Sequence, residues 1–292
     1  MTAEERLIAT MPLPVESLFF DVAGKKLHAV MAGSGPTVVL LHGLNIGWGQ
    51  WYAMIPEIAK TRRVIAIDLT GSGAADKIDY LSVDIAQATV TAVDEALKVL
   101  APSGALVVGH SIGGWAALKL AARNHPSISA VMAVDAVGFT DFIPFGYRPV
   151  ALRPLVRLIA STVMRPTRSN MKSFLGDVMI DPTSMSPEFV DYFFEHVTRP
   201  PASHPLFLIH GMFRPFRMRQ EFVLSSTELS SIACPVTLVH GADDPLIPIG
   251  RVRSKFGKIR QAKVVVMDGV GHVPPIESPD ELTRLITEAF AT

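Results

Sequence analysis

Short, uninterrupted apolar runs recur along the chain, and stretches with helical patterning separate most of them. Strands buried on both faces have this character, whereas half-exposed strands alternate apolar and polar residues. Strand-type runs that alternate with helical stretches favour a parallel sheet with helices on both of its faces. The runs lie at residues 37–41, 64–67, 105–108, 130–134, 236–239 and 264–267.

Two further segments, one near each end of the chain, extend this pattern. Residues 17–22 and 26–31 are typical of a hairpin that turns around Ala23-Gly24-Lys25. Near the other end, Ser278-Pro279-Asp280-Glu281 has a serine at the N-cap, a proline at N1 and a glutamate at N3. This combination predicts a capping box and a final helix that begins directly after Ser278.

The alternation stops between residues 139 and 226. This segment is rich in Phe, Met, Pro and Arg, and no clear series of strands occurs in it. Strand-type runs resume after it, so the segment is typical of several helices inserted into the fold. We therefore expect one core domain built from residues 1–138 and 227–292, with residues 139–226 forming a helical cap over it.

The segment Gly109-His110-Ser111-Ile112-Gly113 matches the pattern G-x-S-x-G. It follows an apolar run directly and precedes the helical pattern of residues 115–122. A serine at a sharp strand-to-helix turn has a strained backbone, and small residues on either side let the chain pass closely. The helix N-terminus beyond it favours negative charge. Ser111 is therefore predicted to be a nucleophile at the carboxyl edge of the sheet.

A serine hydroxyl becomes a strong nucleophile only when a base takes its proton. Of the nine histidines, His272 is the best placed, in a loop with Gly and Pro neighbours between the last apolar run and the final helix. A carboxylate should orient that histidine. Asp243 and Asp244 follow the run at 236–239, and we favour Asp244 because a proline closes the loop after it. Asp135, at the end of an earlier run, is the remaining candidate.

Acyl transfer also needs hydrogen-bond donors for the developing oxyanion. The backbone N–H of Ile112, next to the nucleophile, is one candidate, and the N–H of Leu44, after the run at 37–41, is the other. A simple turn at the end of a strand is the alternative interpretation of the second position. The residues proposed to line an acyl pocket, each of which could instead belong to the core, are Leu44, Trp48, Phe139, Ile143 and Phe145.

The composition limits the partners and the compartment. Lys and Arg total 27 and Asp and Glu total 27, so net charge gives no attraction to nucleic acid. Cys234 is the single cysteine, which excludes an intrachain disulfide and agrees with a reducing compartment. With no signal-peptide pattern and no run of membrane-spanning length, we expect a cytoplasmic monomer or homodimer. The Arg- and Phe-rich residues 213–216 leave open peripheral contact with a lipid surface, or binding of an anionic substrate.

Together these residues resemble the cap-bearing α/β-hydrolase superfamily, and the resemblance covers nearly the whole chain. Residues 68–73 resemble the family's segment D-x-P-G-x-G, with Thr70 where proline is usual; we interpret Asp68 as a turn residue. The resemblance implies an eight-stranded, mostly parallel sheet and a helical lid after strand six. It also implies no cofactor and no metal, and a triad of Ser111, Asp244 and His272.

The subfamily follows from departures at single positions. Ser111 argues against epoxide hydrolases and haloalkane dehalogenases, which resemble this fold but use an aspartate nucleophile. Proline iminopeptidases usually carry tryptophan after the nucleophile, where this chain has Ile112. Carbon–carbon bond hydrolases often carry tryptophan after the catalytic histidine, where this chain has Val273. The sequence favours a serine hydrolase that cleaves a carboxylic ester, or a lactone or thioester, of a small and largely apolar substrate through an acyl-enzyme. The alternatives are a carbon–carbon bond hydrolase of a ring-cleavage product and a non-catalytic ligand receptor or scaffold.

Overall fold

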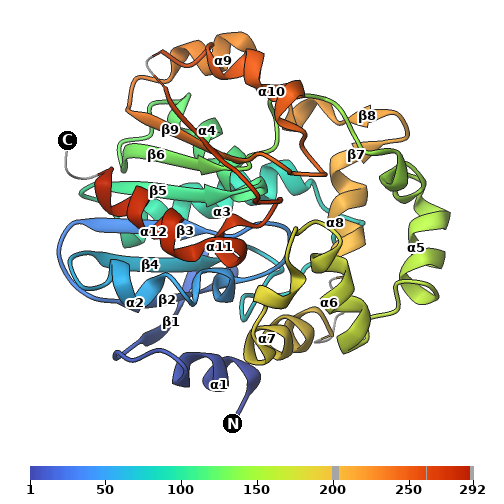
Figure 1. Ribbon diagram of the computed structural model, residues 1–292, viewed down its shortest axis with the longest axis horizontal. Helices are drawn as coiled ribbons and strands as arrows, with labels where there is room; N and C mark the ends of the chain where they lie inside the picture. Colours follow the sequence, from blue (N-terminus) through green and yellow to red (C-terminus); the bar gives the residue numbers. More distant parts are fainter. Residues whose placement is uncertain (199–203, 261, 290–292) are drawn as a thin grey trace.

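A sheet of eight strands forms the centre of the computed structural model, which describes residues 1–198, 204–260 and 262–289 (Figure 1). The strands are β1 (Glu16–Val22), β2 (Lys25–Ala32), β3 (Thr37–Leu41), β4 (Arg63–Asp68), β5 (Ala105–His110), β6 (Ile128–Val134), β9 (Val236–Gly241) and β10 (Lys263–Met267). Their order is β1-β2-β4-β3-β5-β6-β9-β10. The six strands from β4 to β10 in this order run parallel, whereas β2 is antiparallel to both of its neighbours. The predicted eight-stranded, mostly parallel sheet is confirmed.

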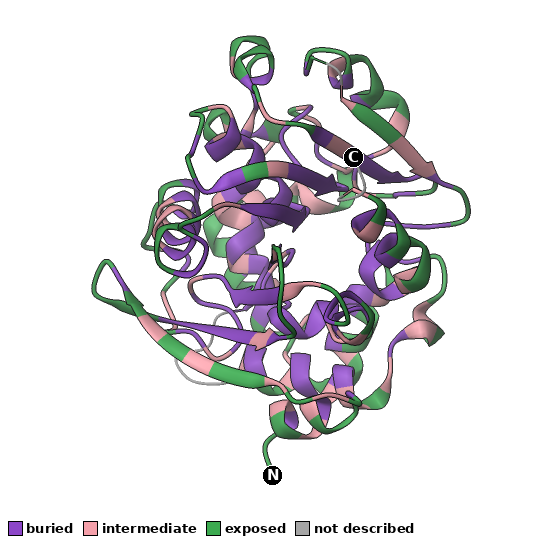
Figure 2. Cartoon of the chain, turned by 90° about the vertical axis from the view of Figure 1, so that its left-hand side faces the viewer, coloured by how far each residue is buried: buried purple, intermediate pink, exposed green. Residues whose placement is uncertain are grey.

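Hydrophobic cores cover both faces of this sheet, which explains the uninterrupted apolar runs. In β3, Val39 and Leu41 belong to one core and Val38 and Leu40 to the other, because successive side chains of a strand point to opposite faces. Figure 2 shows the buried residues concentrated on the central strands and on the helix surfaces that face them. The first core includes residues of α3 (Ile85–Leu100), α4 (Ile112–Ala121), α9 (Ser226–Ser231) and α10 (Ile249–Phe256). The second includes residues of α1 (Ala3–Ala9), α2 (Ile55–Ile58), α11 (Pro274–Glu277) and α12 (Pro279–Glu288).

Helix α12 begins directly after Ser278, as predicted, but the predicted capping box is wrong. The Ser278 side chain makes no capping hydrogen bond. Ser278 also ends α11, and its backbone N–H donates to the carbonyl oxygen of Pro274 at 2.9 Å. Its φ of −144° and ψ of 59° suit this junction between two helices rather than the extended conformation of a normal N-cap.

Among the described residues, the segment between β6 and α9 contains four α-helices and a short two-stranded ribbon. These are α5 (Arg153–Ser161), α6 (Arg168–Gly176), α7 (Pro187–Thr198), α8 (Pro205–Met212), β7 (Phe213–Arg214) and β8 (Arg217–Met218). Figure 1 places them beside the edge of the sheet at which the parallel strands end. We keep the name cap for residues 139–226. No helix among the described residues, in the cap or elsewhere, has the length and apolar character to cross a membrane.

Asp68, at the end of β4, is a fully buried junction rather than a simple turn residue. Its Oδ2 accepts hydrogen bonds from His28 Nδ1 at 2.7 Å and from the N–H of Ala74 at 2.8 Å. Its Oδ1 accepts the N–H of Trp48 at 2.7 Å and lies 3.5 Å from the hydroxyl of Tyr192 in α7. Burial by itself would raise the pKa of this carboxyl, but the hydrogen bond and charge of His28 hold it at about 2. A charged Asp68 thus ties the sheet to the cap.

We predict that Asp68→Asn lowers the free energy of unfolding by about 3 kcal/mol, because buried donors lose their charged acceptor. Part of the free energy of unfolding of the wild type should also depend on pH. The pKa of Asp68 is lower in the folded protein than its ordinary value of 3.8. Its contribution, roughly 2.5 kcal/mol, is therefore complete above about pH 4 and is lost as the pH falls through about 2.

Urea unfolding of both proteins in steps between about pH 5 and pH 2.5 measures this effect. The wild type should lose more stability over this interval than Asp68→Asn. Asp21→Asn, at an exposed position of β1, is the matched control and should follow the wild type. Equal pH profiles for the wild type and Asp68→Asn would contradict the assignment.

Candidate active site

Ser111 lies at the turn between β5 and α4, with a φ of 51° and a ψ of −115°. A Cβ atom on Gly109 would lie 2.5 Å from the backbone of Gly113, and one on Gly113 would lie 2.6 Å from the carbonyl oxygen of Leu41. Both distances are too short for any side chain, so the turn requires glycine at both positions. The sharp turn that the G-x-S-x-G pattern predicts is therefore present in the structure.

The three residues predicted as a triad lie within hydrogen-bond distance of one another. Nε2 of His272, in the loop after β10, is 3.2 Å from Oγ of Ser111. Nδ1 of His272 is 2.7 Å from Oδ2 of Asp244, in the loop after β9. The neighbouring Asp243 is exposed to solvent. The geometry therefore supports Asp244 over Asp243 as the partner of His272.

Asp244 is held as a charged group although it is buried. Its Oδ1 accepts the backbone N–H groups of Leu246 at 2.7 Å and Ile247 at 2.9 Å. Burial alone would raise the pKa of Asp244, but His272 and these donors bring it below its usual range. The negative carboxylate should keep the proton on Nδ1 of His272 and leave Nε2 free to accept the proton of Ser111.

Asp135, the other candidate acid, is buried at the end of β6 and accepts the N–H of Gly241 at 2.9 Å. Burial and the nearby charge of Asp244 raise the pKa of Asp135 well above its usual value. His240, whose pKa is lowered by burial, donates from Nε2 to the carbonyl oxygen of Ile247 at 2.7 Å. Asp135 therefore supports the loop around Asp244 and does not orient His272.

Asp135, His240 and Asp244 also have potential metal-ligand atoms within 4.8 Å of one another. Each of the three, however, already has a hydrogen-bond partner in the protein. Asp244 in particular is fully engaged by His272 and by two backbone N–H groups. The arrangement fits a hydrogen-bonded support for the triad better than a metal site.

Two residues that the sequence analysis did not single out position the loop of His272. The carboxylate of Glu277 accepts the N–H groups of Gly271 at 3.0 Å, of Val273 at 2.9 Å and of Ile180, in the cap, at 2.7 Å. The N–H of His272 itself donates to the carbonyl oxygen of Val178, also in the cap, at 2.8 Å. A carboxylate a few residues after the histidine, in a short proline-rich turn, is the one signal that the sequence contains for this role.

The second residue is His110, which directly precedes Ser111 and for which the sequence indicates a structural role. Burial, with a smaller effect of the nearby His272, lowers the pKa of His110 to about 3. The ring is therefore neutral, and its Nε2–H donates to the carbonyl oxygen of His272 at 2.6 Å. This bond joins the turn that carries the serine to the loop that carries the base.

The predicted oxyanion donors both lie at the cavity next to Ser111. Among the described residues, no hydrogen-bond acceptor takes the backbone N–H of Leu44 or of Ile112. Ile112 opens α4, whose N-terminus favours negative charge. The loop of Leu44 is held by the N–H of Gly43, which donates to Oε1 of Gln50 at 3.0 Å. These positions suit a role in binding an oxyanion, which stays a prediction.

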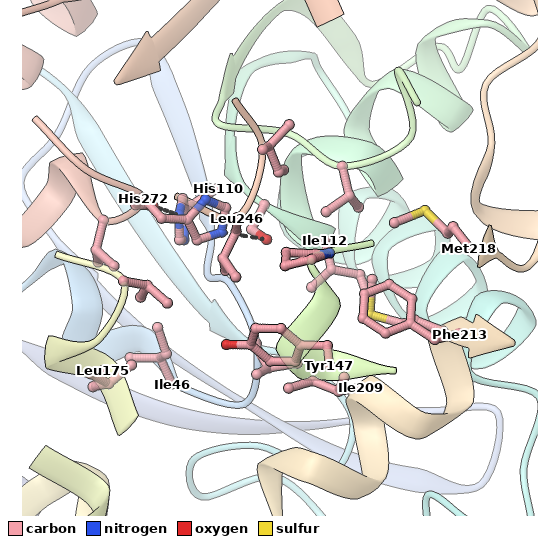
Figure 3. Close-up of a pocket in the computed structure, with 18 of the residues that line it drawn as sticks. Ile46, His110, Ile112, Tyr147, Leu175, Ile209, Phe213, Met218, Leu246 and His272 are labelled. Atoms are coloured by element: carbon pink, nitrogen blue, oxygen red, sulfur yellow. Dashed lines mark hydrogen bonds between the residues drawn. The ribbon is translucent and has the colours of Figure 1, made fainter. Parts of the chain in front are cut away.

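The cavity beside Ser111 has walls from both the core and the cap (Figure 3). His272, His110 and Leu246 lie on one side of it, and Tyr147, Ile209 and Phe213 lie on the other. The lining residues are Leu44, Ile46, His110, Ser111, Ile112, Val137, Phe142, Pro144, Tyr147, Phe174, Leu175, Val178, Ile209, Met212, Phe213, Met218, Leu246, Ile247, His272 and Val273.

Of the five residues proposed from the sequence for this pocket, the structure places only Leu44 at the cavity. Trp48 is buried against Tyr192, with 5.5 Å between ring centroids, and Phe139 packs against Phe256 at 4.9 Å. Ile143 is buried and Phe145 is 80% exposed, and neither contributes to the lining. The sequence shows that these side chains are apolar, but their direction depends on how the cap packs on the core.

Residues 38–285 match the model of the alpha/beta hydrolase family. The chain belongs to this family. It is 27% identical to a 2-hydroxymuconate semialdehyde hydrolase of Pseudomonas sp. (strain CF600), over 92% of each chain. Its fold is similar to that of a naproxen esterase from Bacillus subtilis, with a TM-score of 0.79, 18% identity and coverage of 99% of this chain and 95% of that one. A meta-cleavage product hydrolase from Pseudomonas fluorescens IP01 has a TM-score of 0.76 and 22% identity, with coverage of 94% and 97%.

The adjacent aspartates provide a matched test of the proposed triad. Asp244→Asn should lower kcat by about 10³- to 10⁴-fold, because His272 would lose the charge that sets its tautomer. Asp243→Asn removes the same charge one residue away and should leave kcat within about twofold of the wild type. Steady-state hydrolysis of an activated ester measures both. A fall in kcat that occurs only in Asp243→Asn would mean that Asp243 is the acid.

Proposed function

We propose that this chain is a serine hydrolase that cleaves a carboxylic ester of a small, largely apolar substrate through an acyl-enzyme. The composition of the cavity carries this proposal. Among the described residues, those that line it include no Lys, Arg, Asp or Glu, and the polar side chains among them are His110, Ser111, Tyr147 and His272. An ester group and an apolar acyl chain fit such a lining without unpaired charge.

The proposed reaction has two steps, acylation of Ser111 and hydrolysis of the acyl-enzyme. Ser111 Oγ attacks the ester carbonyl while His272 Nε2 removes its proton, and Asp244 stabilises the resulting imidazolium. The N–H groups of Leu44 and Ile112 bind the oxyanion of the tetrahedral intermediate. His272 then protonates the leaving alcohol, which departs and leaves the acyl group on Ser111. Water activated by His272 attacks this acyl-enzyme and releases the acid.

Hydrolysis of a carbon–carbon bond is the second candidate, favoured by the 27% identity to a 2-hydroxymuconate semialdehyde hydrolase. A muconate is a carboxylate, and burying a carboxylate without a cation or several donors is costly. No cationic side chain of the described residues lines the cavity, and Val273 stands where tryptophan is often found in such enzymes. These observations favour the ester, and a lactone or thioester would fit the same cavity.

A non-catalytic receptor is the third candidate. It would not require the strained backbone of Ser111 or the buried charge of Asp244, and both features have a cost in stability.

The single Cys234 agrees with a reducing compartment, so the cytoplasmic location stays part of the proposal.

The first experiment compares p-nitrophenyl esters from acetate to palmitate on the wild type and on Ser111→Ala. The wild type should turn over the esters with an optimum chain length that reflects the cavity, and Ser111→Ala should be slower by at least about 10³-fold. A matched thioester and a lactone complete the panel.

A 2-hydroxy-6-oxo-2,4-dienoate in the same panel separates the candidates. Faster cleavage of the dienoate than of every ester would replace the ester proposal with carbon–carbon hydrolysis. A folded wild type that cleaves nothing and does not react with a fluorophosphonate would favour a receptor.

A further inference from the structure

The outer side of the cap exposes several large apolar side chains. Phe145 and Phe216 are each 80% exposed. Phe145 opens a short helical turn (Phe145–Tyr147), and Phe216 lies in the turn between β7 and β8. We call the following set the cap surface, all of it exposed and apolar: Phe145, Leu152, Leu155, Leu158, Val163 and Phe216. Large apolar side chains gathered on one face of a soluble domain indicate a binding surface.

The same segments carry a strong excess of positive charge, although the whole chain has a net charge of zero. Residues 142–176 and 204–219 contain no Asp and no Glu. Their cations are Arg148, Arg153, Arg157, Arg165, Arg168, Lys172, Arg214, Arg217 and Arg219. Among the neighbouring acids, Asp191 pairs with Arg168, and Asp79 faces Arg153 and Arg157. Asp141, Asp177 and Glu221 flank these segments at their ends, but the segments themselves carry nine cations and no carboxylate, so the cap surface should attract anions.

Apolar and cationic groups are interleaved on this surface. The guanidinium of Arg148 lies 5.1 Å from the ring centroid of Phe145 and 5.9 Å from that of Phe216. In α5, Val156 and Ala160 are buried against the protein, while two leucines and two arginines are exposed: Arg153, Leu155, Arg157 and Leu158. A helix with leucine and arginine on its free face has the composition of helices that lie in a membrane interface.

The cap surface lies directly outside the cavity. Tyr147 and Phe213 both line the cavity, and their rings pack against each other with 6.4 Å between centroids. They belong to the same short segments as the exposed Phe145 and Phe216. Figure 1 shows α5 at the outer edge of the molecule, with α8 between it and the sheet. None of the arginines of these segments belongs to the cavity lining.

We propose that the cap surface binds the surface of an anionic lipid bilayer. The apolar side chains would enter the boundary between headgroups and acyl chains, and the arginines would face lipid phosphates and carboxylates. A second copy of the chain fits less well, because two cationic surfaces would oppose each other. Single-stranded nucleic acid would pair with the arginines but would leave the leucines and Val163 in water. Binding in this orientation turns the wall of the cavity towards a source of apolar esters.

Co-sedimentation with vesicles tests this proposal without any need for turnover. One set consists of phosphatidylcholine alone, and the other contains about one third phosphatidylserine. The wild type should sediment with the anionic vesicles and much less with the neutral ones. Binding should weaken as salt is raised, because exposed charges are screened.

Two double variants remove the two components of the surface. Arg157→Gln with Arg217→Gln should weaken binding to anionic vesicles about thirtyfold, from the loss of two interfacial cations. Leu158→Ser with Phe216→Ser should weaken it at least about tenfold, from the loss of apolar insertion. The matched controls lie outside the cap. Lys25→Gln with Lys26→Gln, on β2, is the control for the arginine variant. Phe19→Ser with Val99→Ser, at two exposed apolar positions, is the control for the apolar variant. The controls should bind like the wild type, and thermal unfolding checks that every variant folds.

Three results would overturn the proposal. The first is that the wild type sediments with neither kind of vesicle. The second is that the cap variants and their controls lose the same amount of binding to anionic vesicles. The third is a different partner for the cap surface. A wild-type dimer in analytical ultracentrifugation that Leu158→Ser with Phe216→Ser converts to monomer would assign the surface to self-association. Binding of polyuridylate in place of vesicles would assign it to nucleic acid.

Discussion

The strained backbone of Ser111 is the constraint on which the rest of the site depends. A non-glycine residue at a φ of 51° costs about 1–3 kcal/mol and persists only where its surroundings hold it. Here the N–H of Ser111 donates to Val134 in β6 at 2.9 Å, and its carbonyl oxygen accepts the N–H of Trp115 in α4 at 3.0 Å. A parallel sheet that is buried on both faces supplies this rigid frame. The same frame brings the loops after β9 and β10 to the edge where the serine projects.

Three buried carboxyls, those of Asp244, Asp135 and Asp68, differ in the direction of their pKa shifts because they have different hydrogen-bond partners. Asp244 and Asp135 are close enough to disfavour two charges together. Asp244 faces His272 and two N–H donors, which favour its charged form, whereas Asp135 accepts one N–H. Asp68 follows the same rule at a distance from the nucleophile, where His28 and backbone donors compensate its charge. Burial raises the pKa of all three carboxyls, and the neighbouring histidine and N–H donors lower it for Asp244 and Asp68.

The cap joins two surfaces of different character. Its inner side contributes Tyr147, Phe174 and Ile209 to an apolar cavity, and its outer side combines exposed apolar groups with arginine. The cap also holds the loop of His272, because Val178 and Ile180 bond with the backbone of His272 and with Glu277. A movement of the cap would therefore change the position of His272 as well as the shape of the cavity.

The sequence by itself determined the sheet, its helices and the three triad candidates. Two-sided burial leaves uninterrupted apolar runs, and a sharp strand-to-helix turn requires small residues at 109 and 113, so both can be read from residue types in order. Only the tertiary structure placed Asp244 rather than Asp243 beside His272 and Glu277 and His110 around the loop of His272. It also left Trp48, Phe139, Ile143 and Phe145 out of the cavity lining. Local patterns report burial and backbone conformation, whereas the direction of a side chain depends on contacts between segments far apart in the sequence. The capping box predicted at Ser278 is wrong for a local reason, because Ser278 also ends the preceding helix α11.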